Sequence, residues 1–216
     1  VKVYSNELAA PDVSLLKLRL PAGQRAKFKA GQYLQILLDD GSRRSYSMAN
    51  PPQESDGATL HIRHVPGGHF SAQVAQRAPG DTLQIELPFG HVALREDDTR
   101  PIVFVAGGTG FAPVKSILDD MLKRRIKRSV TLIWGARDAA GLYLRQAVER
   151  WQKQWPDFRF VPALSGLPAE DAGGAFAGRV DQDGQVVRQQ RDGARVQARL
   201  DLLGTTPAAH RQLQRL

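Results

Sequence analysis

The chain has 216 residues, enough for two small domains with buried cores. Its formal net charge of +8 is compatible with an acidic or phosphorylated partner, but the charges are dispersed, and solvated surface charges are the favoured interpretation. It contains no cysteine, which excludes disulfides, thiolate zinc sites, a cysteine nucleophile and an iron–sulfur cluster ligated by its own sulfur. Dispersed arginines without a nucleic-acid motif argue against a nucleic-acid partner, and without a signal peptide or a membrane-spanning apolar run we expect a cytoplasmic protein.

The first hundred residues predict a small antiparallel barrel or sandwich. Clusters of proline, glycine and aspartate separate short runs with apolar residues mostly on alternate positions, at residues 13–20, 33–38, 60–65 and 83–87. The longest helical candidate between these runs is the short stretch 70–76. Residues 1–98 are therefore predicted to form one β domain.

The stretch 43–50 reads Arg-Arg-Ser-Tyr-Ser-Met-Ala-Asn, and we expect its first part to be a strand. Side chains alternate along a strand, so Arg44 and Tyr46 share one face. That face would offer a guanidinium to a phosphate and an aromatic ring to a flat heterocycle, and Ser47 would bond the edge of the heterocycle. An ordinary edge strand with mixed side chains is the alternative.

The next candidate site follows the strand that contains His61 and His64. This strand ends in a Pro-Gly-Gly turn, and a helix is expected to start at Ser71. The backbone N–H groups after Gly67 and Gly68, with the Ser71 hydroxyl, are suited to hold a diphosphate. His61 and His64 lie on opposite faces of a strand, so we expect no metal site.

A charged, proline-bounded link at residues 95–101 leads to a different pattern. Strands are predicted at 102–106, 130–134 and 158–162, and the segments between them carry apolar residues at helical spacing. Alternating strands and helices imply right-handed crossovers and a parallel sheet. An α/β domain is therefore predicted over residues 99–182.

A glycine-rich turn follows the first strand of this domain. Gly107, Gly108 and Gly110 let the backbone approach a ligand, and the helix that begins near Pro113 directs its free N–H groups at the turn. The spacing departs from the dinucleotide fingerprint, because Pro113 stands where a third glycine is expected. A diphosphate site and a purely steric turn both remain open at this point.

Together, these three motifs resemble the ferredoxin-NADP reductase family of flavoprotein oxidoreductases. The motifs are Arg-Ser-Tyr-Ser at 44–47, Gly67-Gly68 with Ser71, and Gly-Gly-Thr-Gly-Phe-Ala-Pro at 107–113, and the likeness spans residues 3–165. It is similar in detail to CDP-6-deoxy-glucoseen reductases, oxygenase reductases and NAD(P)H-flavin reductases. The resemblance implies a six-stranded-type antiparallel barrel that binds FAD in preference to FMN, and then a parallel-sheet α/β domain that binds NADH or NADPH.

The resemblance also implies a role for each motif residue. Arg44 would pair with a flavin phosphate, Tyr46 would pack on the isoalloxazine ring and Ser47 would lie near flavin N5. Backbone would line the flavin and its phosphates at His61, Ile62, Arg63, Gly67, Gly68 and Ser71. The diphosphate of the nicotinamide nucleotide would lie at Gly107, Gly108, Thr109, Gly110 and Pro113. The candidates for assisting hydride transfer from nicotinamide C4 to flavin N5 are Tyr46, Ser47 and Thr109.

Arg137 and Asp138 follow the second strand of the α/β half, where this family usually recognises the adenosine ribose. An arginine there favours a 2′-phosphate, and an acidic residue favours the free diol. The presence of both leaves NADH and NADPH open, and two solvated loop charges are the alternative.

The function implied is an FAD-dependent NAD(P)H reductase that passes electrons to an iron–sulfur protein or domain outside the chain. A preceding ferredoxin-like domain is one candidate acceptor, since the start at Val1 indicates a processed product or a segment of a longer polypeptide. The alternatives are a reductase that releases reduced free flavin and a non-catalytic flavin-binding module.

Residues 183–216 depart from the family pattern. They contain no aromatic residue, and the Cys-Gly-Pro-like segment that family members carry beside the nicotinamide is missing. A helical or disordered tail and a shifted reading frame are both open interpretations. We expect an intact flavin site, weakened or lost hydride transfer, and a C-terminal sheet that is partly missing or irregular.

Overall fold

A computed structural model describes residues 1–166, 176–180, 186–188 and 196–198. By their contacts, the described residues divide into two compact units. Residues 1–95 and 112–126 form the first, and residues 96–111 with the described residues from 127 onward form the second.

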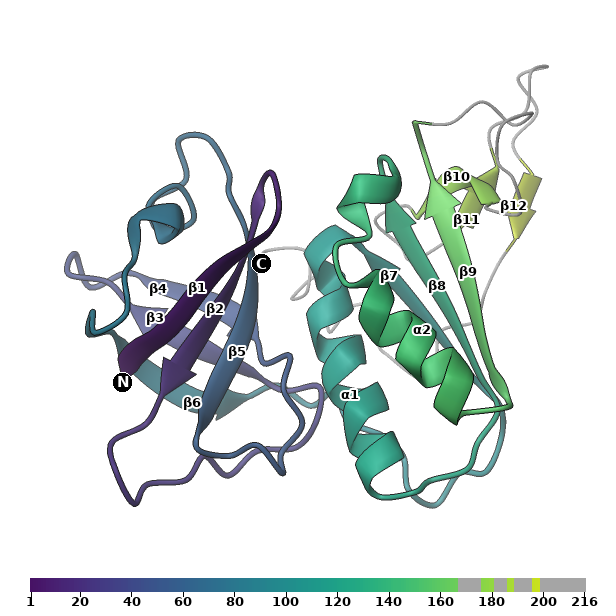
Figure 1. Cartoon of the computed structure of the whole chain (residues 1–216), viewed down its shortest axis with the longest axis horizontal. Helices are drawn as coiled ribbons and strands as arrows, with labels where there is room; N and C mark the ends of the chain where they lie inside the picture. Colours follow the sequence, from purple (N-terminus) through teal and green to yellow (C-terminus); the bar gives the residue numbers. More distant parts are fainter. Residues whose placement is uncertain (167–175, 181–185, 189–195, 199–216) are drawn as a thin grey trace. The chain divides into compact units, whose positions relative to one another are not determined.

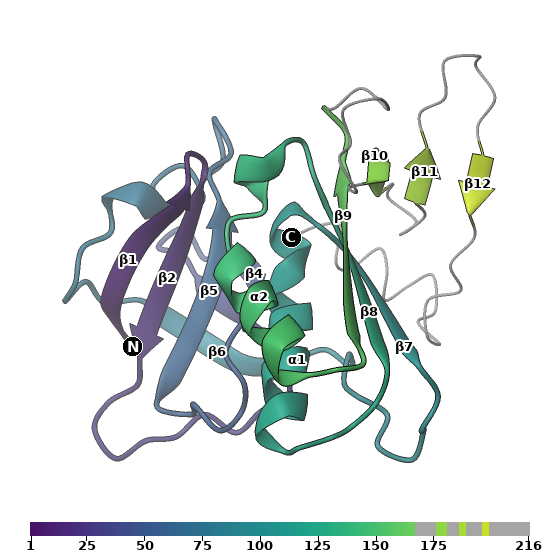
Figure 2. The same ribbon diagram turned by 45° about the vertical axis from the view of Figure 1, so that its right-hand side comes forward.

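The first unit is built on six antiparallel strands in two sheets. One sheet has the order β1 (Lys2–Ala10), β2 (Val13–Arg19) and β5 (Gly57–Arg63), which lie side by side in Figures 1 and 2. The other sheet has the order β4 (Arg43–Ser47), β3 (Tyr33–Leu37) and β6 (Gln84–Phe89).

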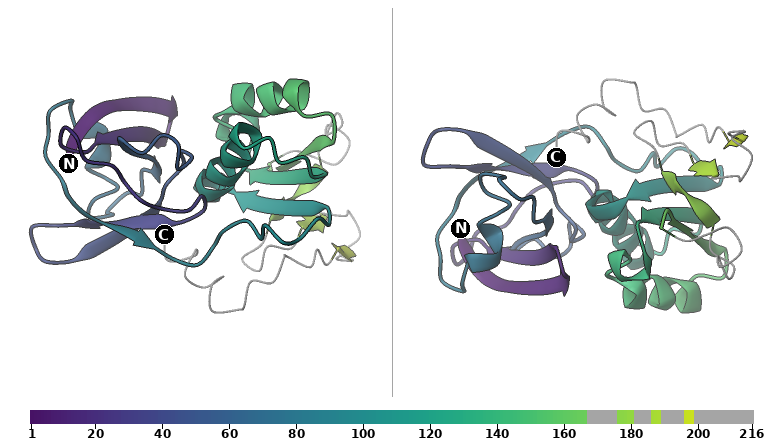
Figure 3. Two further views of the ribbon diagram at one scale, coloured as in Figure 1. Left: turned by 90° about the horizontal axis from the view of Figure 1, so that it is seen from below. Right: turned by 90° about the horizontal axis from the view of Figure 1, so that it is seen from above.

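Single bridges join these two sheets along both edges. One bridge pairs Lys2 with Thr82 and the other pairs Met48 with Leu60. The strands therefore close into a barrel in the order β1-β2-β5-β4-β3-β6, and Figure 3 shows the purple strands β1 and β2 opposite the blue strands β3 and β4. The predicted antiparallel barrel is confirmed.

Alternate residues of these strands fill the interior of the barrel, as the period of two requires. The core side chains are at most 4 % exposed: Leu16, Leu18, Leu34, Ile36, Met48, Leu60, Ile62, Phe70 and Val74. Strand β1 was absent from the predicted elements because it buries only Val3 and Ala10, so it carries no apolar alternation. Its pairing with β2 holds it in the sheet.

The helix predicted near residues 70–76, with its start at Ser71, is wrong. Turns occupy residues 69–73, and a 3₁₀ helix spans Val74–Gln76. The amide of Asn6 donates to the carbonyls of Val74 and Arg77 at 2.7 and 2.9 Å, and Pro79 disfavours helical backbone at the residue before it. Both effects end the helix within one turn.

The second unit contains the predicted parallel sheet. Strands β7 (Ile102–Gly107), β8 (Val130–Ala136) and β9 (Phe158–Leu164) lie in register, and α2 (Arg145–Gln154) connects β8 to β9 (Figure 1). Leu132 and Trp134 of β8 are fully buried, and Trp151 of α2 packs on Phe158 with ring centroids 5.8 Å apart. A 3₁₀ helix, Ala139–Gly141, follows β8.

The sheet continues beyond β9. Strand β10 (Phe176–Val180) is parallel to β9, whereas β11 (Val186–Arg188) and β12 (Val196–Ala198) add antiparallel neighbours. The predicted tail, residues 183–216, lies mostly outside the described residues. The residues described within it, 186–188 and 196–198, are strands, so the helical interpretation is wrong there, while the disordered and frame-shifted interpretations stay predictions.

Helix α1 (Phe111–Lys123) follows β7 in the chain, yet residues 112–126 share their contacts with the barrel. The domain boundaries at residues 98 and 182 remain predictions. Within the described ranges, no helix is long and apolar enough to cross a membrane.

Candidate functional site

Strand β4 presents the first group of predicted site residues. Arg44 and Tyr46 are half-buried on one face, and the Tyr46 ring lies 5.9 Å from the ring of Phe70. Burial raises the pKa of Tyr46 to about 12, so its hydroxyl stays protonated and neutral at physiological pH. Ser47, also half-buried, ends the strand opposite Tyr33. The strand thus presents a cation and a neutral aromatic ring on one face, as alternation predicts, and a hydroxyl at its end.

The loop after β5 supplies a cradle lined by backbone. Gly67 has a φ of +73°, and the N–H of Gly68 donates to the carbonyl of Val65 at 2.9 Å. A Cβ atom added at Gly68 would overlap Ser71 Oγ and lie 2.9 Å from the Val65 carbonyl oxygen. Because there is no helix at Ser71, no helix dipole acts here, and the cradle depends on backbone N–H groups and the hydroxyl alone.

Two contacts connect this loop with β4 and with the turn that precedes it. Phe70 is 1 % exposed and packs against Tyr46, so it anchors the loop from within the core. Asp40 lies 3.6 Å from His69 Nδ1. Hydrogen bonds from Ser42, at 2.8 Å from its N–H and 2.6 Å from its hydroxyl, lower the pKa of Asp40, and the nearby charges of His69 and Arg44 add to this.

Asp40 therefore interacts electrostatically both with Arg44 of β4 and with His69 of the glycine loop. Sequence reasoning missed Asp40 and His69, because Asp40 was used only as a turn signal. A contact between residues 29 positions apart leaves no local pattern.

The side chains at the end of β5 are buried in the barrel or paired with other residues. Ile62 is fully buried in the barrel, and Arg63 forms an ion pair with Asp12 at 2.6 Å. His61 is 5 % exposed, and burial, with the charge of Lys115 nearby, lowers its pKa to about 3. A ligand here would meet backbone, as the resemblance implies. Beyond the Met48–Leu60 bridge, no strand in the described part of the chain pairs with the outer edge of β5.

The glycine turn after β7 forms the second site. Gly107 ends the strand, Gly108 has a φ of +50°, and Gly108–Gly110 is a 3₁₀ helix that leads directly into α1. A Cβ atom added at Gly107 or Gly110 would meet nothing within 4 Å, so open space lies beside the backbone. Thr109, half-buried, stands between them.

Pro113 lies in the first turn of α1, where the backbone N–H that proline lacks is not needed by the helix. Pro113 is buried, and it tolerates the position at which the dinucleotide fingerprint has glycine. The helix therefore starts at Phe111 without a third glycine.

An aromatic cluster fixes the shape of this turn. The indole Nε1–H of Trp134 donates to the carbonyl of Gly108 at 3.0 Å. The Phe111 and Trp134 rings stack with centroids 3.8 Å apart and an interplanar angle of 11°. Sequence reasoning missed Trp134, although a buried indole N–H that needs a partner was a usable signal.

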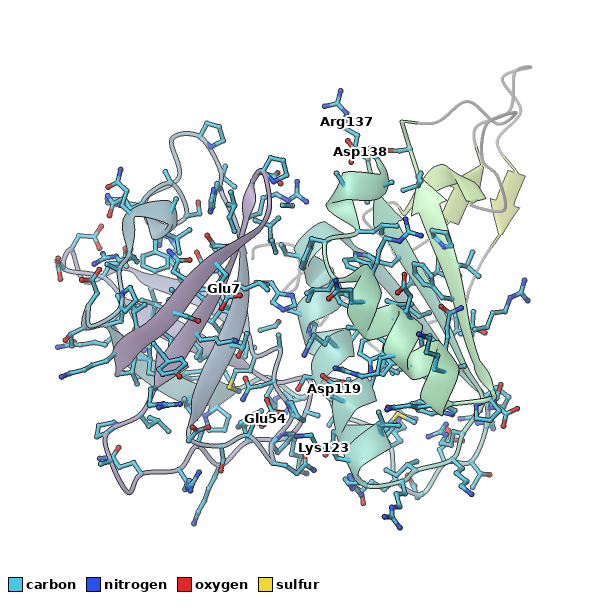
Figure 4. The ribbon with its side chains drawn as sticks, in the orientation of Figure 1. Glu7, Glu54, Asp119, Lys123, Arg137 and Asp138 are labelled. Carbon is cyan, nitrogen blue, oxygen red and sulfur yellow. The ribbon has the colours of Figure 1, made fainter. Side chains whose placement is uncertain are left out.

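Arg137 and Asp138 are exposed after β8, and Figure 4 shows the Arg137 side chain extending outward. The Asp138 carboxylate accepts a hydrogen bond from the N–H of Gly141 at 3.0 Å and so caps the short 3₁₀ helix. The carbonyl of Arg137 accepts from the N–H of Gly166 at 2.7 Å. The acidic side chain thus has a structural partner, and the guanidinium points away from the sheet.

The residues at both sites are compatible with cofactors that carry phosphate groups. A Cβ atom at Gly68 would clash with Ser71 Oγ and the Val65 carbonyl, so the backbone of that loop leaves no room for a side chain, and open space borders Gly107 and Gly110 in the second loop. Arg44 adds a guanidinium at the first site, which suits a phosphate.

Comparison with known proteins agrees with this arrangement. Residues 1–94 match the family described as oxidoreductase FAD-binding domain, and residues 104–193 match the oxidoreductase NAD-binding domain. Over 183 residues the chain is 67 % identical to reductase component 1 of terephthalate 1,2-dioxygenase from a Comamonas species, which covers 83 % of this chain and 53 % of that protein.

More distant relatives share the same portion. The CDP-6-deoxy-L-threo-D-glycero-4-hexulose-3-dehydrase reductase of Yersinia pseudotuberculosis is 39 % identical over 166 residues, 76 % of this chain and 50 % of that protein. The crystal structure of the Amycolatopsis cytochrome P450 reductase GcoB superposes with a TM-score of 0.71 at 36 % identity, covering 77 % of this chain and 51 % of that one. The chain thus spans about half the length of the curated relatives it matches.

The matches, the antiparallel barrel and the parallel sheet with its glycine turn all agree. Residues 1–94 of this chain belong to the oxidoreductase FAD-binding domain family and residues 104–193 to the oxidoreductase NAD-binding domain family, so the chain is a flavoprotein oxidoreductase with an FAD-binding domain followed by an NAD-binding domain.

Proposed function

We propose that the chain is the flavin- and nicotinamide-binding part of an NAD(P)H-dependent reductase, in which FAD accepts hydride and passes electrons to an iron–sulfur protein or domain outside the chain. The observation that carries the proposal is a glycine-containing loop in each domain, tightly packed at Gly68 and open at Gly107 and Gly110. One adjoins Arg44 and Tyr46, and the other lies at the carboxyl end of β7, where open α/β sheets bind ligands.

In the barrel, Arg44 pairs with a flavin phosphate and Tyr46 packs on the ring, since both lie on one face of β4. Ser47 bonds the reactive edge of the ring. The loop with Gly67, Gly68 and Ser71 holds the diphosphate, and the backbone of β5 from His61 through Ile62 to Arg63 lines the ring. A cradle for two phosphates favours FAD over FMN.

In the α/β domain, the nucleotide diphosphate lies against Gly107, Gly108 and Gly110, and Thr109 faces the nicotinamide side. Arg137 is proposed to contact the adenosine end. Its outward guanidinium suits a 2′-phosphate, but NADH and NADPH both remain candidates. We also retain 1–98, 99–182 and 183–216 as the proposed divisions of the chain.

The proposed electron acceptor carries an iron–sulfur cluster held by another protein or domain, because this chain has no cysteine. The name of the Comamonas relative, a reductase component of a dioxygenase, supports an acceptor of this kind. A cytoplasmic location belongs to the same proposal.

The test is a spectrum followed by a titration. The purified protein, loaded with FAD, should keep the flavin visible bands through gel filtration. Anaerobic addition of NADH or NADPH should bleach these bands, and we expect the bleaching to be slower than in full-length reductases of this family. If flavin is lost on the column but reduced in solution, a free-flavin reductase is favoured. Retained flavin that neither nucleotide bleaches would favour a non-catalytic flavin-binding module.

A further inference from the structure

Helix α1 is attached to the segment that directly follows the proposed flavin strand. The hydroxyl of Ser116, which is fully buried, donates to the backbone carbonyl of Asn50 at 2.7 Å. The ammonium of Lys115 donates to the carbonyl of Ala49 at 3.3 Å and forms an ion pair with Asp119 at 2.8 Å. Two adjacent carbonyls after Ser47 thus receive two adjacent side chains of one helix.

The same helix face continues this contact toward its C-terminus. The amide of Gln53 donates to Asp120 at 2.7 Å, and Asp120 is 6 % exposed. Lys123 pairs with Glu54 at 2.7 Å in a solvent-exposed contact, where Figure 4 labels both residues. Positions three and four apart on a helix share a face, so this attachment runs from Lys115 to the end of the helix at Lys123.

The receiving segment is itself held in one conformation. The Asn50 side chain accepts from the N–H of Thr59 at 2.8 Å and donates to the carbonyls of Glu54 and Gly57 at 2.7 and 3.2 Å. The N–H of Ala49 donates to the Thr59 carbonyl at 2.8 Å. The carbonyls that face α1 therefore cannot reorient without breaking the pairing beside β5.

Attachment of the helix alone does not require these polar contacts. The neighbouring residue Ile117 already packs against the barrel, where a Cβ atom added at Gly31 would lie 3.0 Å from Ile117 Cδ1. Burying a hydroxyl and an ammonium is costly unless both have well-aligned acceptors, and apolar side chains could hold the helix without that cost. The polar pair therefore specifies one register between the helix and the Ala49–Asn50 carbonyls.

We propose that Ser116, assisted by Lys115, is a positioning residue for hydride transfer. It connects the end of β4, which carries Tyr46 and Ser47, to the helix that begins one residue after the Gly108–Gly110 turn. It thereby sets the efficiency of transfer rather than the affinity for either cofactor. This inference rests on the proposed function.

The test measures the rate of flavin reduction and the nucleotide dissociation constant in one anaerobic stopped-flow titration of the FAD-loaded protein with NADH and NADPH. For Ser116→Ala we expect the limiting reduction rate to fall about tenfold, because a small misplacement of reacting groups is costly, while both dissociation constants stay within about twofold. Ser116→Thr retains the hydroxyl and should recover most of the rate. Lys115→Met, which keeps the aliphatic stem, should lower the rate in the same way.

Lys123→Ala is the matched control, since it removes an exposed contact of the same helix with the same segment and should leave the rate unchanged. The positioning role is overturned if Ser116→Ala reduces its flavin at the wild-type rate. It is equally overturned if the rate falls only together with flavin affinity and thermal stability, without rescue by threonine. A wild-type protein that neither nucleotide reduces refutes the proposed function itself, and with it this role.

Discussion

At the scale of single residues, neighbouring arginines on β4 provide a sharp comparison. Arg44 faces the Tyr46 side of the strand, whereas Arg43 is exposed and paired with Glu86. Replacing Arg44 with Met should raise the FAD dissociation constant about 10- to 100-fold, the effect of losing a hydrogen bond to a charged group. Arg43→Met should change it little. Fluorescence titration of the flavin-free protein measures both, and equal losses in the two variants would remove Arg44 from the phosphate site.

The buried imidazole of His61 makes stability depend on pH. Its folded-state pKa, about 3, lies below the unfolded value near 6.5, so the unfolded chain binds more protons between these values. The contribution of His61 is fully present above pH 6.5 and declines as the pH falls toward 3, by at most about 1.4 kcal/mol per pH unit.

Urea unfolding at pH 7.5 and pH 5 should therefore show a smaller decrease in His61→Gln than in the wild type. Replacement of the exposed His91 with Gln is the control and should preserve the wild-type decrease. The prediction is wrong if His61→Gln and the wild type lose the same free energy of unfolding.

The sequence predicts which residues share a face of an element when the alternation of side chains along a strand determines it. The shared face of Arg44 and Tyr46 follows from alternation along one strand. The contacts of Asp40 with His69 and of Ser116 with Asn50 join residues far apart in the chain, so no period contains them. Such contacts become visible only once the barrel has closed.

At the scale of elements, the conformation of the loop after β5 requires a residue without a side chain at Gly68. A Gly68→Ala change places a Cβ atom against Ser71 Oγ and the Val65 carbonyl, so the loop must open. We expect FAD affinity to fall about tenfold with the circular dichroism spectrum unchanged. Gly110→Ala introduces the same methyl into open space in the other loop and should leave FAD affinity intact. Unaltered FAD binding by Gly68→Ala would show that the loop does not contact the phosphates.

Among the elements, runs with a clear period were located to within a few residues. The three strands of the parallel sheet were predicted at 102–106, 130–134 and 158–162, and each is observed one to two residues longer. The stretch 70–76 was wrong because Phe70 and Val74 imitate helical spacing while both fill the barrel core. Tertiary burial and the Asn6 amide outweighed the local pattern there.

At the scale of the whole molecule, FAD binding should raise thermal stability through mass action. A ligand at 100 times its dissociation constant adds about 2.7 kcal/mol to the free energy of unfolding. If the phosphates carry the binding, the melting temperature at equal ligand concentration should rise most with FAD, less with FMN and least with riboflavin. Differential scanning fluorimetry measures this order. A riboflavin shift as large as that of FAD would contradict a phosphate cradle.

The order of the two domains was predictable from the whole sequence, because turn-punctuated strands give way to alternating strands and helices near residue 101. The closeness of α1 to the barrel was not, since helical spacing predicts a helix but not its neighbours. The antiparallel strands β11 and β12 beyond β10 were equally unpredicted, because the segment around them carries no buried-strand pattern.

Because the Trp134 indole donates a hydrogen bond to the Gly108 carbonyl, its fluorescence should report on the state of the glycine turn. Indole emission shifts when the polarity or the hydrogen bonding of Nε1 changes, and this indole also stacks on Phe111 at the start of α1. Occupation of the turn should therefore alter the intrinsic fluorescence of the native chain. Nucleotide binding can then be followed apart from flavin chemistry, and replacing Trp134 with Phe assigns the signal against the background of Trp151 and Trp155.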